Sequence, residues 1–581
     1  PRAPSGAVMM IATTATDKTT GEDIGTYSYT LLNENYFNYS LSKGKHEFSA
    51  VLGQSWQYWR TDYGKTVGLD YVTDALYTLN FASQIKSAST TTSISEHALL
   101  SFFARATYSY AGKYLLAANL RSDASSRFGR NNRWGLFPSG SVGWRFSDED
   151  FMEWSSSFLH EGKIRASYGV TGNEAIGNYD SQMVYNSGSY YEGVSGVSPS
   201  RLGNPDLSWE RTNQTNIGLD LAFFDNRLGF TFDWYDKHTT DLLYSCQLPK
   251  ETGFSTITRN VGAMRNRGFE LAISANILRL KNWKWDISLN LSRNNSIVLA
   301  LADGVPFYTG SDNAIFVQEG ARVGEFYGYK HNGIFQYDES NAFTEDWRQL
   351  TPIFSDGVFM HQYLLDGQIY EGTVYQKKYS DGTPFKGGDV NWEDAPTSRN
   401  GIIDTDDRVN IGCAQPDFYG GLNTTLSYKN ISLFVSLYYS FGGQIYNHAR
   451  KVRNTFQRTY TSPEPEVIYN MWTKQGDIAT YARPVSDVEY NRISPSDFWI
   501  EDASFIKIRN IKLTYKLPRQ WMKKAHLKDV TIFGYCNNPL TFTAYSGFDP
   551  EFSGASALSF GIDGGKYPRK REYGFGINVT L

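Results

Sequence analysis

An acidic loop, DVNWEDAPTSRNGIIDTDD at residues 389–407, carries oxygen-bearing side chains that could bind a calcium ion. Asn400 and Gly401 match positions five and six of a twelve-residue calcium loop, and Asp407 matches position twelve. In this register Pro396 stands at position one and Ser398 at position three, so the leading ligands are missing. The alternative is a solvated turn rich in Asn and Asp. The calcium candidates are Asn400, Asp404, Asp406 and Asp407.

Residues for catalysis do not form a recognisable constellation. The eight histidines are scattered, and His160-Glu161 is not followed by the second histidine of a zinc-binding helix. Acid pairs can be picked from SDED (147–150) or DTDD (404–407), but sequence does not supply the separation that glycoside hydrolysis requires. The three cysteines, Cys246, Cys413 and Cys536, have neither disulfide-framework nor zinc spacing. We therefore predict no catalytic residue, no enzyme activity and no cofactor other than calcium.

Aromatic side chains interleave with polar ones through the long segment from about 300 to 410. Such rings stack on sugars and supply contact area at low entropy cost, which favours a binding surface. Equally, a structured loop of this length needs a small core of its own, which the same rings would form. The candidates for a binding surface are Trp347, Tyr363, Tyr370, Tyr375 and Trp392.

The elements around these loops are predicted to be long β-strands. At the end of the chain, Tyr573, Phe575, Ile577, Val579 and Leu581 alternate with glycine, asparagine and threonine. A strand points successive side chains to opposite faces, so one face meets apolar surroundings and the other meets water or polar groups. The pattern recurs in about fifteen strands, many of 10 to 16 residues, joined as hairpins by turns such as those near 111, 225, 281 and 429.

Composition restricts the class of protein. The chain has 581 residues, a net charge of -4 and no Lys/Arg-rich run, which argues against nucleic acid as a partner. Aromatic residues make up 15%, yet no run approaches the roughly 18 to 20 apolar residues of a membrane helix. Without linkers or charge blocks, one large architecture is favoured over several domains.

Short and long links alternate along the chain, with long ones near 174–207, 300–410, 447–502 and 543–566. Up-and-down hairpins then place the long loops at one end and the C-terminus at the other, as in an outer-membrane barrel with a periplasmic C-terminus. A soluble β-sandwich or propeller is the alternative, but no propeller repeat is visible. Strand-end aromatics suited to a membrane girdle, expected to face outward, are Trp234, Trp283, Trp285, Tyr439 and Tyr573.

Eight stretches, in order along the chain, resemble the SusC/RagA family of TonB-dependent outer-membrane transporters. They include RSDASSRFGRNNRWGLFPSGSVGWRFSDEDF (121–151), GNPDLSWERTNQTNIGLDL (203–221), NNPLTFTAYSGFDPE (537–551) and the closing YPRKREYGFGINVTL. The resemblance implies a 22-stranded barrel, a plug domain inside it, a SusD-like surface lipoprotein as a lid, and energy supplied through TonB. It also implies a dimer of transporter and lid pairs.

The chain departs from the family pattern at its start. We find no plug domain, TonB box or first barrel strands, and HEFSAVLGQSWQY (46–58) resembles a mid-barrel strand. Residues 1–581 are therefore expected to form the C-terminal portion of the barrel, with a separate N-terminal segment supplying the plug and the missing strands. An unclosed sheet in lipid would leave backbone groups unpaired, at several kcal/mol each.

The resulting expectation is an active importer of large nutrients in the outer membrane of a Gram-negative, Bacteroidetes-type bacterium, in contact with lipid and lipopolysaccharide. An oligosaccharide is the favoured substrate, and an oligopeptide is the alternative within the family. A passive porin or a surface-binding adhesin is the alternative from another class, and a soluble β-rich glycan enzyme is a third. Arg450, Arg453 and Tyr460, in an expected short helix of the 447–502 loop, would contact the lid or another loop.

Overall fold

Long antiparallel strands dominate the computed structural model, which describes residues 19–71, 73, 78–192, 194–455, 462–484, 495–524, 526–551 and 560–580. The chain forms two compact units. Unit 1 contains residues 1–153, 163–217 and 237–263, and unit 2 contains residues 154–162, 218–236 and 264–581. The first residues and Tyr460 lie outside the described ranges.

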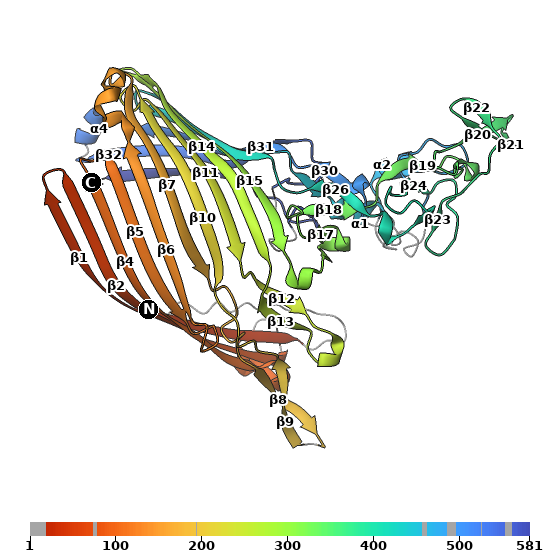
Figure 1. Cartoon of the computed structure of the whole chain (residues 1–581), viewed down its shortest axis with the longest axis horizontal. Coiled ribbons are helices and arrows are strands. Elements are labelled where there is room, and N and C mark those ends of the chain that lie inside the picture. Colours follow the sequence, from red (N-terminus) through yellow and green to blue (C-terminus); the bar gives the residue numbers. More distant parts are fainter. Residues whose placement is uncertain are drawn as a thin grey trace. The chain divides into compact units, whose positions relative to one another are not determined.

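In unit 1, long strands follow one another in the order β1-β2-β4-β5-β6-β7-β10, except that the start of β7 and the end of β10 belong to unit 2. The first two form a hairpin whose register runs from Thr20 opposite Leu69 to Lys43 opposite His46. Figure 1 shows β1, β2, β4, β5 and β6 side by side. Their bounds are β1 Thr20–Lys43, β2 His46–Tyr71, β4 Thr91–Tyr110, β5 Tyr114–Ser125, β6 Trp134–Arg145, β7 Leu159–Asn173 and β10 Glu210–Phe223.

Shorter elements join these strands. β3 (Ala82–Ile85) pairs with β2, and two hairpins form from β8 (Val184–Tyr191) with β9 (Val194–Arg201) and from β12 (Leu243–Gln247) with β13 (Thr256–Asn260). A small core joins Phe137 on β6 to Phe128, Leu207 and Trp209 in the links.

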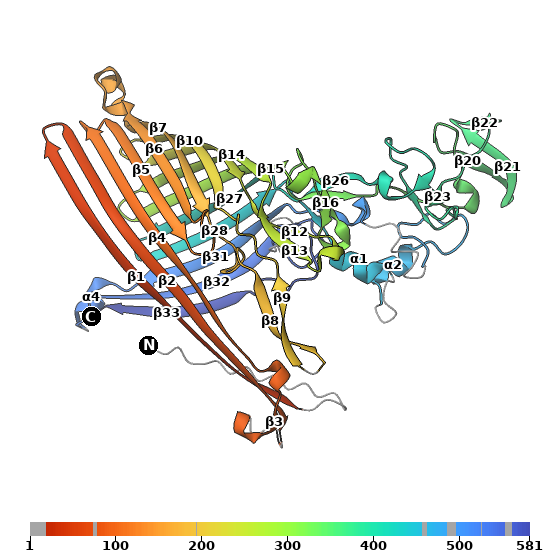
Figure 2. The same cartoon turned by 60° about the horizontal axis from the view of Figure 1, so that its bottom comes forward.

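In unit 2 the order is β11-β14-β15-β27-β28-β31-β32-β33. The sheet order thus contains fifteen long strands in the described ranges, which agrees with the number expected from sequence. Figure 2 shows β31, β32 and β33 running side by side. The bounds are β11 Leu228–Thr240, β14 Ala263–Arg279, β15 Trp283–Ala300, β27 Phe418–Tyr428, β28 Ile431–Phe441, β31 Phe505–Lys516, β32 Asp529–Thr543 and β33 Glu572–Thr580.

The link between β15 and β27 is a folded region of its own. It contains small sheets whose strands are β16 Phe307–Thr309, β17 Ile315–Val317, β18 Glu325–Gly328, β19 His331–Ile334, β20 Thr351–Ser355, β21 Val358–Leu365, β22 Gln368–Tyr370, β23 Lys378–Tyr379, β24 Val390–Trp392, β25 Ile402–Ile403 and β26 Val409–Cys413. The link between β28 and β31 holds β29 Gln444–Tyr446, α1 His448–Asn454, α2 Pro465–Asn470 and β30 Ile500–Asp502, and α4 (Arg519–Lys524) precedes β32.

One face of the unit 2 sheet is apolar and exposed. Direct antiparallel partners share a face, and one such ladder joins Trp285, Leu426, Leu433, Leu513, Gly534 and Phe575. A second ladder joins Trp283, Tyr428, Ile431, Tyr515, Ile532 and Ile577. Phe575 is 84% exposed. Apolar groups of this size are tolerated on an exterior that faces lipid.

Four of the five predicted girdle residues lie near strand ends, whereas Trp234 lies in the middle of β11, and their exposure differs. Trp283 and Tyr573 are exposed, while Trp234, Trp285 and Tyr439 are half-buried. Trp285 donates its indole N–H to Thr424 Oγ1 at 2.8 Å, and Tyr439 donates its hydroxyl to the Asn290 carbonyl at 2.7 Å. No helix within the described ranges is long and apolar enough to span a membrane.

The small residues of β33 make room for aromatic rings on the neighbouring strand. A Cβ on Gly574 would lie 2.5 Å from the Tyr535 ring, and one on Gly576 would lie 2.5 Å from the Phe533 ring. This part of the small-residue face therefore contacts rings, where we had expected it to face water. By contrast, a Cβ on Gly534, on the exposed apolar face, would have only the Gly574 carbonyl oxygen nearby, at 3.8 Å.

Replacing Gly574 or Gly576 by valine is expected to weaken the pairing of β32 with β33. Overpacking of this kind costs about 1 to 3 kcal/mol, because the rings must leave their rotamers. The free energy of unfolding in detergent, followed by tryptophan fluorescence during urea titration, measures the loss. Gly534→Val is the matched control and should cause no loss. Equal effects of all three substitutions would contradict the packing described here.

Candidate functional site

The long link between β15 and β27 has a hydrophobic core of its own. Its buried members are Tyr329, Phe335, Phe343, Phe385, Trp392 and Ile403, with Trp347 packed against them. Trp392 is 8% exposed, and its ring packs edge to face against the Tyr329 ring, with 6.1 Å between the ring centres. Two of the predicted surface aromatics, Trp347 and Trp392, therefore support the loop from within.

The three tyrosine candidates lie nearer the surface. Tyr363 on β21 and Tyr370 on β22 are direct antiparallel partners, so their side chains share one face of the small β20-β21-β22 sheet. Both are half-buried, and Tyr375 is 38% exposed. Sequence placed these residues in one loop, but only the register shows that Tyr363 and Tyr370 lie side by side.

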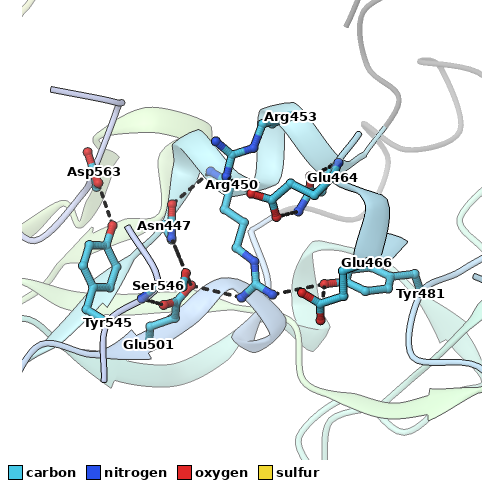
Figure 3. Close-up of polar contacts among 11 residues, drawn as sticks. Asn447, Arg450, Arg453, Glu464, Glu466, Tyr481, Glu501, Tyr545, Ser546 and Asp563 are labelled. Carbon is cyan, nitrogen blue, oxygen red and sulfur yellow. Dashed lines mark hydrogen bonds and ion pairs between the residues drawn. The ribbon is translucent and has the colours of Figure 1, made fainter. Parts of the chain in front are cut away.

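Arg450 joins segments of the link between β28 and β31 that are distant from one another in sequence (Figure 3). Its guanidinium donates to Glu501 Oε1 at 3.2 Å and to the Tyr481 hydroxyl at 3.1 Å. Glu501 also accepts from Asn447, from the Ser546 hydroxyl and from the Ser546 backbone N–H. Burial raises the pKa of Glu501, but these donors outweigh it and hold that pKa below its usual value.

The neighbouring Arg453 is exposed and forms an ion pair with Glu464. Arg450 and Arg453 both lie on α1, which confirms the short helix expected in this loop. Their partners Glu464, Tyr481 and Glu501 belong to the same 447–502 loop, so contact of the arginines with the lid or with another loop stays a prediction.

A buried ion pair anchors the same helix. Lys451 on α1 is 3% exposed, and its Nζ donates to Asp312 Oδ2 at 2.8 Å. Asp312 also accepts from the Tyr446 hydroxyl at 2.7 Å, and His448 Nε2 lies 3.6 Å away. Burial raises the pKa of Asp312, yet Lys451 and Tyr446 together hold it below its usual value. The pair therefore stabilises the loops above about pH 4 and loses that contribution as pH falls through the lowered pKa.

A cavity of about 90 Å³ in unit 2 was not foreseen from sequence. Its lining includes His331, whose Nδ1 lies 2.6 Å from Asp497 Oδ1, and Arg483, whose Nε donates to Asp389 Oδ1 at 2.8 Å. Its lining residues come from β19, from α1 and from the segments around residues 389 and 483. Because these segments are far apart in sequence, no local motif predicts the cavity.

A larger concavity of about 1080 Å³ lies in unit 1. Serine, threonine, asparagine and glycine residues make up about half of its lining, together with Glu47, Lys163 and Arg165. Apolar side chains such as Leu115 and Val142 make up much of the rest, so the lining is mixed.

The calcium candidates occupy one turn. Asp407 is buried, Asp404 is half-buried, and Asn400 and Asp406 are exposed. Within the described ranges, no three His, Cys, Asp or Glu side chains are grouped to hold a metal ion. The calcium prediction is not tested by that observation, because calcium also binds carbonyl, amide and water oxygens.

Removing only the cation of the buried pair should loosen α1. Lys451→Met leaves Asp312 without its ammonium, at a cost of about 2 to 3 kcal/mol since the carboxylate is partly solvated. Amide hydrogen exchange in α1 should then accelerate by roughly 30- to 150-fold. The double variant Lys451→Met/Asp312→Asn removes both charges and should recover most of the protection. Equal exchange in both variants would show that the charge pair is not the anchor.

Comparison with known proteins places this arrangement in a family. Residues 11–347 match the model described as "TonB dependent receptor-like, beta-barrel". TonB-dependent receptor P39 of Formosa agariphila is 38% identical over 566 residues, which cover 96% of this chain and 54% of that protein. TonB-dependent receptor SusC of Bacteroides thetaiotaomicron is 27% identical and is covered over 51% of its length. These relatives are named as receptors and not as enzymes.

Solved structures agree with the sequence comparison. The structure of the RagAB peptide transporter superposes on this chain with a TM-score of 0.77 and 25% sequence identity. The match covers 97% of this chain and 56% of the transporter chain. This chain spans about half the length of the curated relatives it matches. The long antiparallel strands, each with an apolar and a more polar face, agree with these matches. The chain belongs to the TonB-dependent receptor β-barrel family of the outer membrane, as a transmembrane barrel of the SusC/RagA type.

Proposed function

We propose that this chain forms the C-terminal part of the barrel of an active importer of large nutrients. The observation that carries the proposal is the similarity to SusC and to the RagAB transporter along nearly the whole chain. The large links of unit 2 support it, since they have hydrophobic cores and buried ion pairs and are therefore built structures. A receptor surface needs such order to hold a ligand in one geometry.

The proposal includes partners. A SusD-like lipoprotein would cover the outer mouth, TonB would supply energy, and an N-terminal segment would contribute the plug and further strands. Pairs of barrel and lid would form dimers. The long links would then face outward and the C-terminus the periplasm, in keeping with the alternation of link lengths.

An oligosaccharide is the proposed substrate. Tyr363 and Tyr370 support it, because paired half-buried rings on a small sheet offer faces on which a sugar can stack. A peptide is the second candidate within this function, favoured by the similarity to a transporter that is named for peptides. A passive porin and an adhesin are the candidates from another class, and neither requires energy from TonB.

Uptake in living cells separates these functions. We expect cells with the intact transporter to accumulate a fluorescent oligosaccharide mixture, and to lose that accumulation when TonB is depleted. Persistent uptake without TonB would indicate a porin. Surface retention without entry would indicate an adhesin. TonB-dependent uptake of labelled oligopeptides, with none of glycans, would replace the proposed substrate.

The loop tyrosines provide a second test in the purified transporter. Tyr370→Ala should weaken glycan binding by about 1 kcal/mol, or roughly fivefold, because one stacking ring is lost. Ile369→Ala removes an exposed side chain from the opposite face of the same strand and should leave the affinity unchanged. Isothermal titration calorimetry measures both. Matching losses would exclude a specific role for the tyrosine face.

A further inference from the structure

The acidic loop folds in a register different from the one read from sequence. Asp394, and not Pro396, accepts the hydrogen bond from the backbone N–H of Gly401, through Oδ2 at 2.8 Å. Gly401 has a φ of 75°, the left-handed conformation that a calcium loop requires of its sixth residue. The loop therefore does have a leading aspartate. It lies two residues earlier in the sequence than the first position of a twelve-residue calcium loop.

The remaining candidates continue this arrangement. Asn400 Oδ1 accepts from the Ile402 N–H at 2.8 Å, and Asp404 Oδ1 accepts from the Asp406 N–H at 2.8 Å. Asp407, at the twelfth position, is 1% exposed. Its carboxylate accepts from the Ala395 N–H, the Ser398 hydroxyl and the Asp404 N–H, at 2.8, 2.6 and 2.9 Å.

One oxygen in this loop lacks a partner. Asp394 is 5% exposed, and within the described part of the chain its Oδ1 is buried and accepts no hydrogen bond. A buried carboxylate oxygen is costly unless it is paired, protonated or bound to a cation. Burial and the adjacent Asp407 carboxyl raise the pKa of Asp394, although the bond from Gly401 opposes them. The buried carboxyl groups of Asp394 and Asp407 thus lie close together, and they retain oxygen lone pairs that accept no hydrogen bond.

The nearby lysine is engaged elsewhere. Lys377, 4% exposed, donates from Nζ to Asn391 Oδ1 at 3.2 Å and to the Trp392 carbonyl, and the ammonium lies 4.6 Å from the centre of the Phe343 ring. Burial lowers its pKa to about 8, against the opposing effect of the neighbouring carboxylates. No ion pair in the described ranges joins Lys377 to Asp394, so its charge acts on the pair only from a distance.

We propose that residues 394–407 form a calcium site in which Asp394 Oδ1 and the Asp407 carboxylate are the charged ligands. Asn400 and main-chain carbonyl oxygens of the loop would supply neutral ligands, as calcium accepts six to eight oxygens. An ionised carboxyl group has about four acceptor positions. Asp407 has one left after its three bonds, and Asp394 has the whole of Oδ1. With only two charged ligands, we expect a dissociation constant in the range of about 0.1 to 1 mM.

Terbium luminescence tests the site directly in the complete, detergent-solubilised transporter. The Trp347 ring packs over Gly401, so it can sensitise a terbium ion bound in this loop. We expect sensitised emission that saturates and that calcium displaces. Asp394→Asn keeps the size of the side chain but removes a charge and should weaken binding at least tenfold. Glu371→Gln removes one charge from an exposed side chain outside residues 394–407 and should change affinity less than twofold.

Proteolysis provides an independent reading without terbium. Arg399 is exposed near the tip of the loop, where trypsin can cleave. Calcium should slow this cleavage in the unmodified protein and in Glu371→Gln, but not in Asp394→Asn. If Asp394→Asn disturbs the loop core, Asn400→Ala replaces it, because Asn400 is exposed and its loss should weaken binding severalfold. Absence of saturable binding up to about 10 mM calcium, or unchanged affinity in Asp394→Asn, would overturn the proposal.

Discussion

The whole structure depends on one requirement, that backbone N–H and C=O groups surrounded by lipid must be paired within the protein. An unpaired group in hydrocarbon costs several kcal/mol, so a spanning chain that is not helical must form continuous strand pairs. The long registers meet this requirement between neighbouring strands, as in β1 and β2, where twenty-four residues face partners. Once the backbone is paired, side chains alternate, and apolar ladders such as the one through Leu433 and Leu513 cover one face.

The folded links between the strands are stabilised in a different way. Their stability comes from small cores, such as the one around Phe335 and Phe385, and from buried ion pairs such as Lys451 with Asp312. Charged groups there connect segments that are far apart in sequence. Arg450 illustrates this, since it bridges Tyr481 and Glu501 and so fixes the position of α1 relative to two other segments.

The acidic loop shows how a ligand set can be hidden by an insertion. Counting twelve positions backward from Asp407 gives Pro396 and predicts that the leading ligands are missing. Folding displaces the intervening residues outward, where Pro396 and Arg399 are exposed, and brings Asp394 back to Gly401. The geometry of the hydrogen bond, and not the spacing in sequence, identifies the equivalent residue.

Sequence by itself determined the strands, their number, the alternation of their faces and the pattern of short and long links. These follow from local rules, because a period of two and the chemistry of tight turns involve neighbours only, as at Lys429 with its φ of 51°. The family resemblance came from ordered motifs in the same way. Only the tertiary structure decided which loop aromatics are buried, what Arg450 contacts, why Gly574 and Gly576 are glycine, and which aspartate begins the acidic loop. Each of these depends on contacts between residues distant in sequence, or on two additional residues that the folded loop accommodates. Local periodicity carries no information about either.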